Sequence, residues 1–114
     1  GPFVVGPPIE RKIGASAFSQ LAINATKWHS AAWGKEKGLY SEVYDNAEDM
    51  DSSINLLAEK LANSNPESMQ SLKKIIWANT DFWDKLLIER AEISGEKVLS
   101  KFTRKTLLEL KNSS

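Results

Sequence analysis

The sequence contains no cysteine, which excludes a disulfide framework, thiol chemistry and zinc sites built on cysteine. Fifteen basic and fifteen acidic residues leave no net charge, and this balance argues against a large nucleic-acid surface, because such surfaces need an excess of lysine and arginine. No apolar run approaches the roughly 20 residues that cross a bilayer, and no signal peptide is visible. We therefore expect a cytoplasmic protein that binds neither nucleic acid nor a membrane.

Recognisable catalytic and cofactor motifs are also missing. The one histidine, His29, has no nucleophile or carboxylate at a spacing typical of acid–base catalysis. The carboxylates are plentiful, but none follows a metal-loop pattern, and there is no GxGxxG or Walker motif. We predict no catalytic residue, no metal site and no tightly bound cofactor in this chain.

The sequence shows helical periodicity over most of its length. Its 114 residues are enough for one domain with a modest core. Residues 1–8 hold three of the four prolines and are expected to form a loop. The predicted caps are Ser30, Gly38, Asp45 or Asn46, Asn65, and Thr80 or Asp81. The apolar spacing predicts helices over about 9–25, 26–37, 45–63, from Pro66 onward, after Thr80 or Asp81, and after a break at Ser100.

One stretch does not fit a helix. Residues 39–44 read Leu-Tyr-Ser-Glu-Val-Tyr, a composition that favours a β-strand. A single strand needs a partner, so its partner would come either from another molecule or from a larger protein of which this chain is a piece. The opening Gly1-Pro2, unlike a natural domain start, also favours the second interpretation.

Two groups of residues are candidate binding features. Four tryptophans are many for this length, and a core or an interface is their commonest use. Near the end, "LSKFTRKTLLELK" gathers Lys101, Arg104 and Lys105. A solvated helix face is the usual role of such residues, and a phosphate contact is the alternative.

Three stretches, taken in order, resemble the C-terminal part of the crotonase superfamily, the enoyl-CoA hydratases and isomerases. "RKIG" at 11–14 matches an Arg-x-x-Gly pattern that precedes a helix. Ser30-Ala31 and Gly38-Leu39, with Val43, match "SAxxAxxxGLVxxV". "MDSSINLLAEKLANSNPESMQSLKK" at 50–74 matches "LxxxAxxLAxxLAxxxPxAxxxxK" without a gap. The departures are a missing paired glycine near Gly6, Gly34 where the family often has alanine, and a C-terminus without the family's Glu-Gly and Phe.

The resemblance implies a mainly α chain, the helical C-terminal part of a crotonase-like α/β fold with one short strand. Residues 1–44 would follow the active-site half, and residues 45–114 would form an oligomerisation or lid region. The parent enzyme would act on acyl-CoA as a trimer or a dimer of trimers, with its oxyanion hole and catalytic glutamates outside this chain.

The chain would then supply assembly surface and pocket wall, with Lys101, Arg104 and Lys105 as possible contacts to coenzyme A phosphates. The alternative is a stand-alone helical interaction module. Neither interpretation distinguishes the acyl substrate, or hydration from isomerisation.

Overall fold

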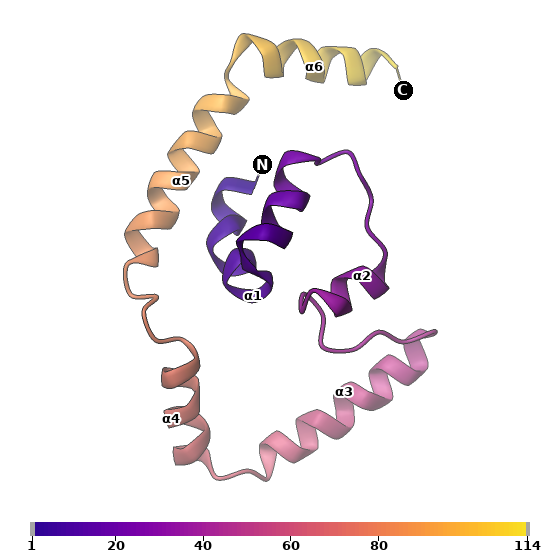
Figure 1. The fold of residues 1–114 in the computed structure, drawn as a ribbon, viewed down its shortest axis with the longest axis vertical. Coiled ribbons are helices and arrows are strands. Elements are labelled where there is room, and N and C mark those ends of the chain that lie inside the picture. The colour runs from indigo at the N-terminus through magenta and orange to yellow at the C-terminus, as the bar shows by residue number, and fades with distance from the viewer. Residues whose placement is uncertain (1, 114) are drawn as a thin grey trace. The chain divides into compact units, whose positions relative to one another are not determined.

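The computed structural model describes residues 2–113, and over this range the protein is mainly helical, as predicted (Figure 1). The helices fall into two compact units: the first combines the chain up to Thr26 with the chain from Phe82 onward, and the second spans Lys27–Asp81. The predicted division between residues 44 and 45 lies inside the second unit. In chain order the helices are α1 (Pro2–Ile23), α2 (Ala31–Glu36), α3 (Ala47–Ala62), α4 (Pro66–Ile76), α5 (Trp83–Val98) and α6 (Lys101–Asn112).

Helix α1 begins at Pro2, so the loop predicted for residues 1–8 is wrong over the described residues 2–8. Pro7 and Pro8 lie inside the helix, where each forgoes a backbone hydrogen bond because proline has no N–H. A tertiary contact offsets this cost: a Cβ added at buried Gly6 would lie 3.1 Å from Cζ of Phe18. The Phe18 ring therefore packs on the Gly6 backbone, and packing within α1 outweighs the local preference of the proline-rich stretch.

The contact between Gly6 and Phe18 depends on a break at Gly14. The Gly14 backbone has φ 82° and ψ 163°, a non-helical conformation inside α1 that residues with a Cβ rarely adopt. Apart from its chain neighbours and the adjacent backbone of its own helix, no described atom lies within 4 Å of the position that a Gly14 Cβ would take. Gly14 is needed for its backbone angles, which let the two segments of α1 fold back on each other.

The rest of the first unit is α5, which packs against α1 and α6. The predicted cap of α5 at Thr80 or Asp81 is wrong: Phe82 precedes the helix without a side-chain cap, and Thr80 Oγ1 donates to the Trp77 carbonyl oxygen at 2.7 Å. The predicted break at Ser100 is confirmed, because the Thr103 N–H donates to Ser100 Oγ at 3.2 Å and α6 starts there.

The second unit opens with α2, which is shorter than the predicted 26–37 helix. Ser30 caps its start by accepting from the Trp33 N–H at 3.1 Å. Its end is a Schellman motif: Gly38 has φ 84°, the Gly38 N–H donates to Lys35 O at 3.0 Å, and the Leu39 N–H donates to Gly34 O at 2.8 Å. The predicted roles of Ser30 and Gly38 are both confirmed.

The strand predicted at 39–44 is wrong, and residues 2–113 contain no strand. These residues run as an irregular extended segment between α2 and α3. Extended residues with strand-like composition still need a neighbouring strand to form a ladder, and here α2 and α3 hold the segment instead. Because no strand forms at residues 39–44, this segment gives no support to the view that the chain is a piece of a larger protein.

Helices α3 and α4 both start at asparagine caps, as predicted. The Asp49 N–H donates to Asn46 Oδ1 at 2.8 Å, and the Ser68 N–H donates to Asn65 Oδ1 at 3.1 Å, with Pro66 in the first turn. The apolar stripe of α3 is exposed: Met50 41%, Ile54 53%, Leu57 57% and Leu61 49%. Ala17 is the one buried hydrophobic side chain among residues 2–113, and none of the described helices has the length and hydrophobicity to cross a membrane.

Candidate functional site

The predicted phosphate contacts lie together on α6. Lys101, Arg104 and Lys105 occupy its first two turns, which Ser100 caps, and all three are exposed. Lys105 Nζ lies 4.0 Å from Glu109 Oε1, one turn further on. Such an exposed pair contributes at most about 1 kcal/mol, so these side chains can turn toward an anion at little cost. They can hold phosphate oxygens through charge-assisted hydrogen bonds, and nothing in their geometry suggests proton transfer.

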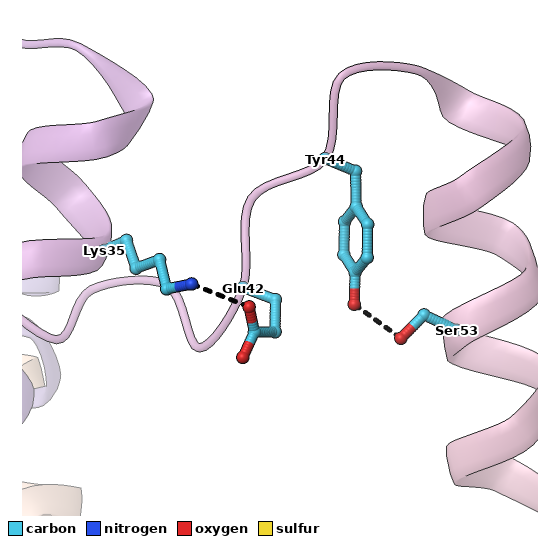
Figure 2. A network of polar contacts seen from close by, with 4 residues as sticks. All are labelled: Lys35, Glu42, Tyr44 and Ser53. Carbon is cyan, nitrogen blue, oxygen red and sulfur yellow. Dashed lines mark hydrogen bonds and ion pairs between the residues drawn. The ribbon is translucent and has the colours of Figure 1, made fainter.

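A second group of polar residues fixes the extended segment to its flanking helices (Figure 2). Lys35 Nζ of α2 donates to Glu42 Oε2 at 2.8 Å. This hydrogen bond, together with the charge of Glu42, raises the pKa of Lys35 above its usual 10.5. On the other side, Tyr44 Oη donates to Ser53 Oγ of α3 at 2.5 Å. The sequence predicted neither pair. The first pair depends on the chain reversal at Gly38, which brings residues 35 and 42 together.

The segment also packs on α2 through an aromatic ring. A Cβ at buried Gly34 would lie 2.7 Å from Cδ2 and Cε2 of Tyr40, so the ring lies against the bare Gly34 backbone. Beside it is an open hollow of about 430 Å³ lined by Tyr40, Glu42, Tyr44 and Met50, among others. The hollow has an acidic and aromatic lining, and no serine, threonine, cysteine or lysine is among its lining residues.

An apolar groove of about 500 Å³ lies where α3 meets α4. Leu61, at the end of the α3 stripe, faces three residues of α4, namely Met69, Leu72 and Ile76, with Gln70 and Lys73 at the rim. The exposed fractions of Leu72 and Ile76 are 47% and 55%. The stripes of α3 and α4 thus join into one exposed apolar surface, which we call the α3–α4 surface.

His29 packs against the ring of a neighbouring tryptophan. Its ring tilts by 37° against Trp33, with 4.1 Å between ring centroids, and its buried Nε2 has no hydrogen-bond partner in the described chain. Within residues 2–113 no cluster of three metal-ligating side chains occurs.

Comparisons with models of protein families, with curated proteins and with solved structures give no match. The class that the structure defines is therefore a mainly helical protein with exposed amphipathic helices.

Proposed function

We propose that this chain is the C-terminal helical segment of an enoyl-CoA hydratase or isomerase of the crotonase superfamily. In that role it contributes oligomerisation surface and a wall of the acyl-CoA pocket, while the oxyanion hole and catalytic glutamates lie elsewhere in the parent enzyme. The observation that carries the proposal is the α3–α4 surface, which stays exposed within its own unit. Contiguous apolar faces of this kind mark contacts with another protein body.

The positions of the resembling motifs support this proposal. Gly38-Leu39 forms the Schellman end of α2, the Leu-Ala pairs of the longest motif lie on α3, and its proline begins α4. The second motif thus ends α2 at its glycine, and the longest motif spans α3 and α4, with the turn between them before its proline.

The residues of this chain agree with a role as a non-catalytic segment of the parent enzyme. The family stabilises a thioester enolate with backbone N–H groups and uses glutamates as acid and base. The resemblance gives Glu10 no such role, because it places the family's catalytic elements upstream of residues 1–8. Lys101, Arg104 and Lys105 would contact coenzyme A phosphates in a cytoplasmic trimer or dimer of trimers.

The test is to purify the native gene product, compare its mass with 12.7 kDa, and assay hydration and isomerisation of short enoyl-CoA thioesters. A longer product that is active supports the proposal. A 12.7 kDa product without either activity overturns it and leaves the helical interaction module.

A matched pair of variants tests the role of the α3–α4 surface in the native product. Leu57 lies on the α3 stripe, whereas neighbouring Leu56, which is 62% exposed, lies about 100° away around the helix. Leu57→Asp should lower both assembly and enoyl-CoA turnover, and Leu56→Asp should leave them near the parent values. Equal effects of the two variants would contradict an assembly role for this stripe.

A further inference from the structure

The extended segment between α2 and α3 places two tyrosines and a carboxylate on one side. Tyr40, Glu42 and Tyr44 alternate along residues 39–44, and residues two apart in an extended chain point the same way. Figure 2 shows the side chains of Glu42 and Tyr44 extending to the same side of the segment. All three residues line the hollow of about 430 Å³, a volume within the roughly 300–1,000 Å³ of small-molecule sites.

The charged residues that line this hollow are acidic. Glu42 and Asp45 belong to the lining, which includes no lysine, arginine or histidine. Lys35 engages one oxygen of Glu42, Oε2, and no ion pair engages Asp45 within residues 2–113. Residues 31–50, which supply the whole lining, hold five acidic and two basic residues, a net charge of −3. The N-terminus of α3 adds only about half a positive charge, so the hollow attracts cations.

Aromatic and sulfur groups form another part of the lining. The Tyr40 ring lies against Gly34, while half of the residue stays exposed. The Tyr44 hydroxyl donates to Ser53 Oγ, which holds this second ring beside α3. Met50 adds a polarizable thioether. Because the face of a tyrosine ring attracts a cation within about 6 Å of its centroid, the hollow combines two kinds of group that favour positive charge.

This combination distinguishes between classes of cation. Ca²⁺ takes about six to eight oxygen ligands, and no group of three metal-ligating side chains occurs in the part of the chain that the structure describes. A primary ammonium is strongly hydrated, and an open hollow does not remove its water. A quaternary ammonium carries the same charge beneath an apolar surface, which suits aromatic rings and a thioether.

We propose that the hollow binds a trimethylammonium group, with Tyr40 and Tyr44 contacting its methyl groups and with Glu42 and Asp45 balancing its charge. Small molecules such as choline carry this group, and so does a trimethylated lysine of a partner protein. The site does not depend on the proposed function, because its test measures binding and no enoyl-CoA activity.

The first test titrates the 114-residue chain with three related ligands and follows its amide resonances by NMR. Choline carries the trimethylammonium group, its neutral isostere carries a tert-butyl group instead, and ethanolamine carries a primary ammonium. Choline should shift the resonances of residues 40–50 with a Kd of roughly 1–10 mM, because the hollow is open. The two analogues should bind more weakly by at least about fivefold.

Matched variants separate the ring from its hydroxyl, and the hollow from the overall charge. Tyr44→Leu should raise the choline Kd roughly fourfold, whereas Tyr44→Phe, which keeps the ring and loses the bond to Ser53, should change it by less than about twofold. Glu42→Gln should raise the Kd roughly threefold at low salt, and Glu48→Gln, at an exposed position outside the lining, should leave it unchanged. Lys35→Gln should lower it about twofold, because it frees Glu42.

A pair of peptides distinguishes the two sources of the group. If a short peptide with one trimethyllysine binds at least about tenfold more tightly than choline, the group belongs to a partner protein. If the peptide binds no more tightly than choline, the group belongs to a small molecule. The same peptide without methylation should bind more weakly in both cases.

Three results would overturn the proposal. The first is no shift at residues 40–50 with choline at about 50 mM, and the second is equal binding of choline and its neutral isostere. The third is a Tyr44→Leu variant that binds choline as tightly as Tyr44→Phe does. Circular dichroism of every variant should show the helix content of the parent, so that a loss of binding cannot come from unfolding.

Discussion

The contact between Gly34 and Tyr40 gives a prediction whose sign depends on one ring. Glycine inside a helix is about 1 kcal/mol less favourable than alanine, so Gly34→Ala should by itself stabilise α2. A Cβ there would lie 2.7 Å from two Tyr40 ring carbons, whereas carbon atoms rest at about 3.5–4.0 Å. The substitution therefore forces the ring away by about 1 Å or more.

The cost of moving the ring can be bounded from its burial. A tyrosine buries about 150–250 Å² when fully covered, and Tyr40 is 50% exposed. The buried half is therefore about 75–125 Å², and losing most of this contact, at about 25 cal/mol per Å², costs about 2 kcal/mol. This exceeds the helix gain, so Gly34→Ala should lower the free energy of unfolding by about 1 kcal/mol. In a Tyr40→Ala background the same change should raise it by about 1 kcal/mol.

The assay is urea unfolding of the parent chain, both single variants and the double variant, followed by circular dichroism. The coupling free energy from this cycle should be about 2 kcal/mol. A Gly34→Ala effect that is equal in the two backgrounds, or stabilising in both, would refute the packing argument.

Three further predictions concern single features. Gly14→Ala should cost about 1–3 kcal/mol in unfolding free energy because its backbone, with φ 82° and ψ 163°, is strained for residues with a Cβ; a neutral result would mean that α1 has no break there. Ser100→Ala should cost about 1 kcal/mol and Ser100→Asp much less, as urea unfolding can measure; equal losses would contradict the cap. The Lys35–Glu42 ion pair should be intact at neutral pH and be lost as pH rises through the raised pKa of Lys35; an NMR titration should show that this pKa falls in Glu42→Gln, and an unchanged pKa would contradict the pairing.

Helix ends were the features most readily predicted from the sequence. Asn46, Asn65 and Ser100 each accept a hydrogen bond from an N–H three residues further on, and Gly38 supplies the positive φ of the Schellman motif. These interactions are local, so residue type and spacing are enough to identify them. The clustering of the basic residues of α6 followed from helical spacing in the same way.

One error was local, because Thr80 bonds the carbonyl oxygen of Trp77 and does not cap α5. The other errors came from contacts between residues that are distant in sequence or from the absence of a neighbour. The helix over residues 2–8 is accompanied by Gly6 packing on Phe18, and no local pattern in a proline-rich stretch signals that contact. Residues 39–44 have strand-like composition, but β-propensity reflects packing on neighbouring strands, and none is present in the described chain. The spacing of the α3 stripe predicted a helix correctly but could not tell whether its apolar side is covered.

The extended segment between α2 and α3 has a consequence for solvent exchange. The Leu39 and Tyr40 amides are bonded to Gly34 O, while the amides of residues 41–45 have no backbone acceptor within the described chain. Side chains, through Lys35–Glu42 and Tyr44–Ser53, hold this stretch in place. Its amide protons should therefore be replaced by deuterium quickly although its conformation is defined, so that rapid exchange here reports missing backbone hydrogen bonds and not local unfolding.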